Sequence, residues 1–283
     1  MNAMRMRLII GLLVLLAACD NVPATPTETP TLTGPTLAPT EVFRPDIQAL
    51  DPAATRSIGQ NDLTAASVPS GGELPPLAIG TPNPDAMFST VQITAADGAL
   101  LIGDLYPNPA NQRVPGVLLI APDRTAWLDL PLRLQAAGYT ALAMDLPVGA
   151  ALTDFEAMIR ALSETGTVDP GRIAVVGAES GADLALTGCA NNLLCDAAAL
   201  FSPVQQAAVR AATFGFNPRP LFLSAGSGDA SASVVESIRA VATGTVVLET
   251  VSGSRRGAAL IGVQPDLVDR LIAFLDEQLP PIQ

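Results

Sequence analysis

From Met87 onward the sequence alternates between continuous apolar runs and amphipathic stretches. Runs such as Val117–Ile120 and Ile173–Val176 carry no polar residue at alternate positions, which favours strands covered on both faces of a sheet. Amphipathic stretches of helical length follow several of these runs. The alternation predicts a mostly parallel sheet with helices on both faces.

The pattern gives specific ranges for the elements. We expect eight strands, at Ser89–Thr94, Leu100–Leu105, Val114–Ile120, Thr140–Met144, Ile173–Val176, Ala197–Phe201, Pro220–Ser224 and Thr245–Val251. We expect helices at Ala126–Ala137, Ala151–Thr165, Ser180–Ala190, Ser231–Val241 and Gln264–Gln278.

At the N-terminus, two positive charges precede a short apolar run. Arg5 and Arg7 lie before Leu8–Leu16, which is too short to span a bilayer comfortably as a helix. Residues 1–18 therefore read as a secretory signal peptide. The run closes with Leu-Ala-Ala before Cys19, which resembles the bacterial lipobox, where the cysteine receives lipid and becomes the first residue of the mature chain. The alternative is an unlipidated cysteine after an ordinary signal peptide.

Lipid on Cys19 would anchor the protein to a membrane surface without spanning it. No later stretch of 18 apolar residues contradicts this expectation. We therefore predict an extracytoplasmic protein, lipid-anchored to the cell membrane.

Residues 19–85 are rich in Pro, Thr, Ser, Gly and Ala and include the run PATPTETPTLTGPTLAPTE. Such a segment buries too little apolar surface to offset its ordering entropy, and its prolines favour extended conformations. We expect a disordered tether over residues 19–85 and one folded domain over residues 86–283.

The charge pattern argues against several partners and ligands. The net charge is −12, and every one of the 15 basic residues is arginine. An acidic chain without basic clusters argues against nucleic acid as a partner. The chain has no histidine, so we expect no metal site, and no motif implies a cofactor.

Residues 168–172 lead into the sequence IAVVGAESGADLAL, which reads as a strand, a glycine-flanked turn and a helix. This passage resembles the nucleophile elbow of α/β-hydrolases, most closely their dienelactone-hydrolase-like branch. The preceding AAGYTALAMDLP, which contains Asp145, is similar to the same family. The resemblance covers about 195 residues and implies an α/β-hydrolase fold. The connection from Ser202 to Arg219 is too short for a large lid.

The elbow departs from the family pattern G-x-S-x-G at its central position. Gly177 and Gly181 supply the two glycines, and the residue midway between them is Glu179. The adjacent Ser180 is either the cap of the following helix or a displaced nucleophile. Its backbone N–H is also a candidate oxyanion donor, whereas Pro122, after the strand at Val114–Ile120, has no N–H to offer.

The other two triad positions are Asp229 and Arg256. Asp229 follows the strand at Pro220–Ser224 and is either the triad acid or an acid at a helix N-terminus. The family's histidine follows the last strand in a pattern such as G-S-x-H-G, and Arg256 stands in its place within the sequence GSRRG. Arginine stays protonated in proteins and cannot act as a general base.

Complementary charges at these positions suggest that the triad has been replaced. Glu179 would benefit from the helix N-terminus, and Arg256 would point toward it with Asp229 behind. We predict an ionic network of acid, arginine and acid that fills the former site.

Cys189 and Cys195 enclose five residues between the elbow helix and the next strand. They are either a disulfide, which an extracytoplasmic compartment permits, or two small buried hydrophobic residues.

Two functions are consistent with these features. One is a catalytically inactive pseudoenzyme that serves as a binding or structural module for an unknown protein or small-molecule ligand. The alternative is a weak or altered esterase or lactonase of the dienelactone hydrolase type. The missing histidine and Glu179 at the nucleophile position favour the first.

Overall fold

The computed structural model describes residues 78–79, 87–110 and 112–280. The predicted signal peptide, Cys19 and nearly all of the predicted tether lie outside these residues. The predictions made for them therefore stay predictions.

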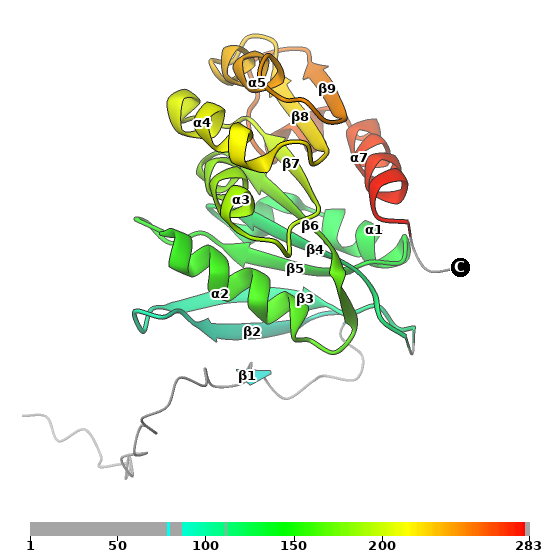
Figure 1. Ribbon diagram of the computed structural model, residues 1–283. Coiled ribbons are helices and arrows are strands. Elements are labelled where there is room, and N and C mark those ends of the chain that lie inside the picture. Colours follow the sequence, from blue (N-terminus) through cyan, green and yellow to red (C-terminus); the bar gives the residue numbers. More distant parts are fainter. Residues whose placement is uncertain (1–77, 80–86, 111, 281–283) are drawn as a thin grey trace, which may run out of the picture. The chain divides into compact units, whose positions relative to one another are not determined.

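The core of the structure is one mixed sheet of nine strands in the order β1-β2-β3-β5-β4-β6-β7-β8-β9 (Figure 1). Five neighbouring pairs are parallel: β4/β5, β4/β6, β6/β7, β7/β8 and β8/β9. The other three pairs, β1/β2, β2/β3 and β3/β5, are antiparallel. The strands are β1 (Ala78–Ile79), β2 (Ser89–Thr94), β3 (Leu100–Tyr106), β4 (Val114–Ala121), β5 (Thr140–Asp145), β6 (Val168–Ala178), β7 (Ala197–Phe201), β8 (Leu221–Gly226) and β9 (Val246–Val251).

All eight predicted strands are present, which confirms the predicted fold class. The added strand β1 lies inside the segment expected to be a tether and pairs with β2. β6 begins at Val168, five residues before the predicted start, because its first part pairs with the start of β4 across an irregular register.

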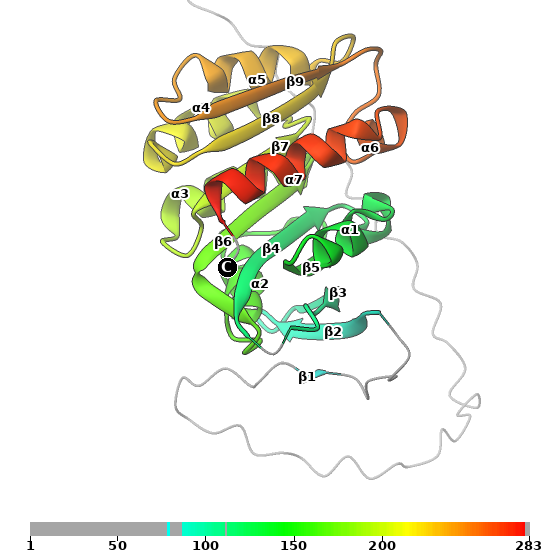
Figure 2. The ribbon, with the colours of Figure 1, turned by 90° about the vertical axis from the view of Figure 1, so that its right-hand side faces the viewer.

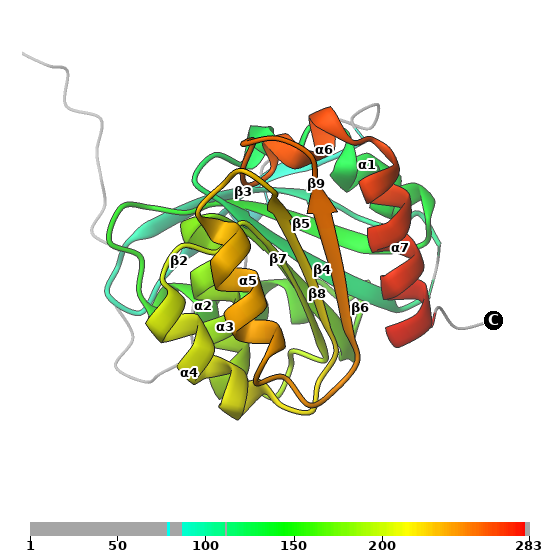
Figure 3. The same cartoon turned by 90° about the horizontal axis from the view of Figure 1, so that it is seen from above.

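Helices cover both faces of the sheet (Figures 2 and 3). The 3-10 helix η1 (Arg124–Trp127) and helices α1 (Leu130–Ala136), α6 (Ala259–Val263) and α7 (Asp266–Gln278) pack on one face. Helices α2 (Leu152–Ser163), α3 (Ser180–Asn191), α4 (Gln206–Phe216) and α5 (Ser231–Arg239) pack on the other. Successive residues of β4 alternate between the two cores: Leu118 and Ile120 face α2 and α3, and Val117 and Leu119 face α1 and α7. A strand buried on both faces needs such an uninterrupted apolar run.

Three helical segments differ from the prediction. α4 occupies most of the Ser202–Arg219 connection, for which no helix was predicted, and α6 was also missed. The helix expected over Ala126–Ala137 is two shorter pieces, η1 and α1. Leu128, between them, has φ 54°, a left-handed conformation that a continuous right-handed helix excludes.

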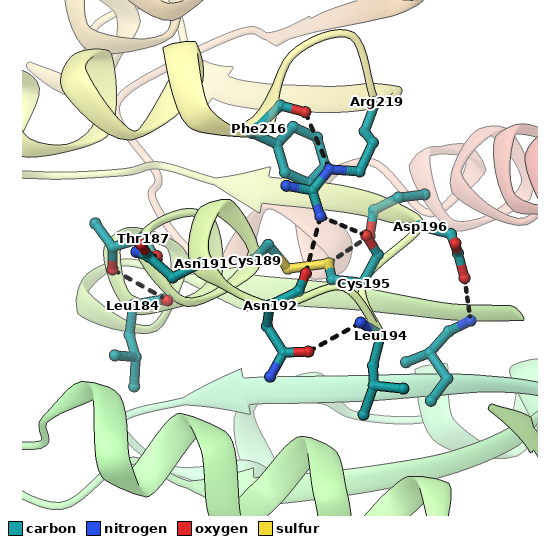
Figure 4. Close-up of a disulfide and its surroundings, with 12 residues drawn as sticks. Leu184, Thr187, Cys189, Asn191, Asn192, Leu194, Cys195, Asp196, Phe216 and Arg219 are labelled. Carbon is teal, nitrogen blue, oxygen red and sulfur yellow. Dashed lines mark hydrogen bonds between the residues drawn. A yellow bond between two sulfur atoms is a disulfide. The ribbon is translucent and has the colours of Figure 1, made fainter. Parts of the chain in front are cut away.

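At the C-terminal end of α3, Cys189 and Cys195 form a disulfide with a Cα–Cα distance of 5.3 Å (Figure 4). Of the two alternatives for these cysteines, the structure has the disulfide. Because it closes a short loop, the chain-entropy argument gives a stabilisation of about 2 kcal/mol.

Arg219 fastens the same loop to the end of α4 (Figure 4). Its Nη1 donates to the carbonyl oxygens of Asn192 (3.0 Å) and Cys195 (2.8 Å), and its Nε donates to that of Phe216 (3.0 Å). The guanidinium also lies 4.3 Å from the centroid of the Phe216 ring. This end of α3 is therefore tied both covalently and by charge-assisted hydrogen bonds.

Within the part of the chain that the structure describes, no helix has the length and apolar character needed to cross a membrane.

Candidate functional site

The elbow between β6 and α3 is strained at Glu179. Glu179 has φ 56° and ψ −121°, a conformation that side-chain-bearing residues rarely adopt. Its N–H donates to the carbonyl oxygen of Phe201 at 2.9 Å, so the turn is held against β7. Strain of this kind costs about 1–3 kcal/mol and persists only where the surroundings enforce it. The sharp turn predicted from the motif is thus present, with a glutamate at its tip.

Both elbow glycines are required by close backbone approach. A Cβ on Gly177 would lie 2.3 Å from the carbonyl oxygen of Gly181. A Cβ on Gly181 would lie 2.3 Å from the carbonyl oxygen of Ile120, in β4. These distances are far below van der Waals contact, so the packing of α3 against β6 depends on Gly177 and its packing against β4 depends on Gly181.

The predicted contact between Glu179 and Arg256 is present. Arg256 Nη2 lies 3.0 Å from Glu179 Oε2, and the two side chains are 51% and 35% exposed respectively. Gly257, with φ +59°, follows directly, and a Cβ there would lie 2.7 Å from Cγ of Glu179. The loop after β9 therefore packs closely over the glutamate and brings Arg256 to it.

Asp229 belongs to a different set of contacts. Its Oδ2 accepts hydrogen bonds from both the N–H and the hydroxyl of Ser231, at the start of α5. Burial raises the pKa of Asp229, but the Ser231 hydrogen bonds and the Arg256 charge outweigh it, so the net shift lowers this pKa below its usual value. These contacts fit the helix N-terminal alternative.

The predicted three-membered network is therefore only partly present. Among the described residues, Asp229 and Arg256 form no ion pair within 4.0 Å. The charge of Arg256 acts on Asp229 from a longer distance and lowers its pKa. The prediction failed here because Ser231 turns the carboxylate toward α5.

Ser180 is the first residue of α3 and is exposed. The helix has no side-chain cap hydrogen bond, so the capping role considered for Ser180 is wrong. Its N–H has no intrahelical acceptor, as for every residue of a first helical turn. In the loop after β4, Pro122 lacks an N–H and the N–H of Arg124 donates to Asp145 Oδ1 at 2.7 Å, so neither of these two residues supplies a second donor.

An ionic cluster that no sequence motif indicated lies at the same edge of the sheet. Arg124, after β4, places Nε 2.7 Å from Oδ2 of Asp104 in β3 and pairs through Nη1 with Asp145 at the end of β5. Thr90 donates to the other oxygen of Asp104 at 2.8 Å. The hydrogen bond that Arg124 donates to Asp104, opposed by burial, raises the pKa of Arg124. The cluster fixes the loop that follows β4.

A cavity of about 680 Å³ opens beside Ser180. Its wall comes from the β5–α2 loop and the first turns of α3 and α4, and it is mostly apolar, with Leu146, Val148, Leu152, Leu184 and Ala208 among its lining residues. The buried Asp183 contributes a carboxylate. Burial raises the pKa of Asp183, against the opposing hydrogen bonds from the N–H groups of Val204 (2.9 Å) and Gln205 (3.1 Å).

No protein-family model and no curated protein matches this sequence. Solved structures do resemble it in fold. An esterase from Pyrococcus furiosus has a TM-score of 0.57 and 19% identity, over 73% of this chain and 97% of its own. The esterase domain of a Rhodothermus marinus protein has a TM-score of 0.58 and 15% identity, over 68% and 99%. An α/β hydrolase from a Penicillium species has a TM-score of 0.57 and 16% identity, over 68% and 99%.

The chain has the α/β-hydrolase fold. Identities below one fifth establish the fold and leave the chemistry to the residues of the site. In this α/β-hydrolase-fold domain the tip of the elbow carries an acid paired with an arginine, and the described residues hold no group of three or more His, Cys, Asp or Glu side chains suited to a metal ion.

Proposed function

We propose that the protein is an extracytoplasmic lipoprotein, anchored through Cys19, whose domain belongs to the dienelactone-hydrolase-like branch and binds a small ligand without hydrolysing it. The observation that carries the proposal is the ion pair between Glu179 and Arg256 at the elbow. Hydrolysis through a covalent intermediate needs a nucleophile and a group that takes and returns a proton near neutral pH. The chain contains no histidine, and arginine cannot fill that role.

The same ion pair argues against Glu179 as a substitute nucleophile. A glutamate could in principle attack an ester, but water must then cleave the resulting anhydride or ester intermediate, which requires a base. Arg256 neutralises Glu179 and supplies no base. Proton transfer contributes roughly two to four orders of magnitude in rate, and its loss leaves little turnover.

The cavity beside Ser180 is the proposed ligand site. Its volume lies in the range of small-molecule sites, and its walls are mainly apolar with a few polar groups. Asp183 is the charged residue among those lining the cavity, and its carboxylate favours a neutral, largely apolar ligand over an anion.

Catalysis is tested with p-nitrophenyl butyrate as the substrate, using the full chain and the Glu179→Ala variant. We expect the two proteins to give the same rate, no faster than the spontaneous reaction. Turnover that disappears in Glu179→Ala would establish the altered esterase instead.

Ligand binding is tested on the same ester by saturation-transfer NMR. Ala207 and Ala208 are both exposed on α4, but only Ala208 lines the cavity. Ala208→Trp should abolish the transfer signal and Ala207→Trp should not. Equal signals from the two variants would exclude this cavity as the site.

Anchoring is tested by fractionating bacterial cells that express the chain. We expect the protein in the membrane fraction, and the Cys19→Ser variant outside it, because acyl chains supply the membrane affinity. Membrane association that survives Cys19→Ser would remove lipidation from the proposal.

A further inference from the structure

We propose that a second, smaller cavity, lined by Ser202, Asp229 and Arg256, is a binding subsite for a compact neutral group that both donates and accepts hydrogen bonds, such as a primary amide or a hydroxyl. It shares no lining residue with the larger cavity and does not depend on the ligand proposed there.

The cavity has a volume of about 60 Å³. Its walls are the ends of β7 and β8, the first turn of α5 and the loop after β9, with the lining residues Ser202, Pro203, Val204, Asp229, Ala230, Ser231, Val234 and Arg256. A space of this size holds a water or a group of a few atoms, such as an amide.

Ser202 supplies a hydroxyl that has no partner within the described chain. Its side chain is buried, with the residue 1% exposed, and Oγ makes no hydrogen bond to any described atom. A buried polar group without a partner is costly, and such groups in native structures usually bind water or a ligand. The hydroxyl can act as donor or acceptor.

The backbone holds this hydroxyl in place. Ser202 has φ 54°, and its N–H donates to the carbonyl oxygen of Ser224 at 2.8 Å. Two residues later, the N–H groups of Val204 and Gln205 are held by the buried carboxylate of Asp183. Ser202 is therefore fixed on both sides in a strained conformation and cannot readily turn outward.

The charges around the cavity select for a neutral group. The lining carries one acid and one cation, so an anion would be attracted by Arg256 but repelled by Asp229, and a cation would be attracted by Asp229 but repelled by Arg256. A neutral amide avoids both penalties. Its N–H can donate to Asp229 and its oxygen can accept from Arg256 or Ser202.

The test is an NMR titration of the full chain with acetamide, acetate and methylammonium at constant ionic strength. We expect acetamide to shift the backbone amide signals of Ser202, Ala230 and Ser231 saturably, and the two ions to bind at least ten-fold more weakly. Acetate or methylammonium binding as tightly as acetamide would overturn the charge argument. No saturable shift with acetamide would show that the cavity holds only water and would overturn the subsite.

Variants of Ser202 test the role of its hydroxyl. Ser202→Ala and Ser202→Gly should each weaken acetamide binding by about five-fold, the usual worth of one neutral hydrogen bond. The glycine variant also relieves the positive φ, so it stays folded if the alanine variant does not. Ser163→Ala, at the end of α2, is the matched control and should leave binding unchanged, because this hydroxyl donates only to the carbonyl oxygen of Arg160 among the described residues. Unchanged binding in Ser202→Gly would exclude Ser202 from the subsite.

The two proposals can fail separately. Shifts at Leu152 and Ala208 report the larger cavity, and shifts at Ser202 and Ala230 report the smaller one. Loss of one set leaves the other proposal standing.

Discussion

The two ends of α3 each receive an arginine from a distant part of the chain, and the two arginines are used differently. At the C-terminal end, Arg219 donates to the carbonyl oxygens of Asn192, Cys195 and Phe216 beside a disulfide. At the N-terminal end, Arg256 makes one hydrogen bond, to Glu179, and remains 51% exposed.

The contacts of Arg219 and of Arg256 therefore differ in how much they contribute to the stability of the domain. Hydrogen bonds from a charged group to partly buried carbonyls are among the stronger ones, whereas an exposed ion pair contributes about 0–1 kcal/mol. The elbow end also retains the positive φ of Glu179, which works against stability. We infer that the disulfide end holds α3 in place and that the elbow end is maintained for its arrangement of groups.

The largest effect should come from Arg219→Met, which keeps the apolar stem and removes the guanidinium. We expect it to lower the free energy of unfolding by about 2–3 kcal/mol, because several carbonyl groups lose a charged donor at once. Urea denaturation measures this. The matched control is Arg210→Met on the exposed side of α4, which should change stability by less than about 0.5 kcal/mol. Equal effects of the two variants would contradict the structural role of Arg219.

The sequence predicted the fold well because burial on both faces leaves a strong local signal. Val117–Ile120 and Ile173–Val176 lie in central strands, and their apolar runs mark them directly. α4 carries a helical signal too, with Val209, Thr213 and Phe216 buried on one face, although the predicted elements include no helix there. α6 has only five residues, too few for periodicity to show.

Within the site, only the residues at motif positions could be predicted from the sequence. The elbow fixes Glu179, and the end of β9 fixes Arg256, so their contact followed from the resemblance. The Arg124–Asp104 contact depends on β3 lying next to β5 in the sheet, which no local pattern specifies. Whether the Asp229 side chain turns toward Ser231 or toward Arg256 depends on its rotamer, which no sequence pattern predicts.

The second prediction concerns how the free energy of unfolding depends on pH through two carboxyl groups near the N-terminal end of α3. Burial raises the pKa of Asp183, so its contribution to stability is complete below the unfolded-state pKa of about 4 and is lost as the pH rises through the folded-state value. Asp229 has a lowered pKa, so its contribution is present above about pH 4 and is lost as the pH falls through the folded-state value.

Urea denaturation between about pH 3 and pH 7 tests these opposite signs, with Asp183→Asn and Asp229→Asn as the variants. Relative to Asp183→Asn, the wild type should lose stability as the pH rises. Relative to Asp229→Asn, it should gain stability over the same range. Differences of the same sign would show that one of the two environments is wrongly assigned. Each effect should be smaller than that of Arg219→Met, because a single carboxyl group is involved.

The smallest effect should come from breaking the ion pair at the elbow. We expect Arg256→Met to change the free energy of unfolding by less than about 1 kcal/mol, because water screens both exposed partners. A double-mutant cycle of Arg256→Met with Glu179→Gln isolates the pair, and its coupling should stay below about 1 kcal/mol and shrink in high salt. A coupling as large as the Arg219→Met effect would mean that both ends of α3 are structural. A small coupling together with intact folding would mean that the stability of the domain does not explain this pair of charges, which leaves the ligand site as the reason for it.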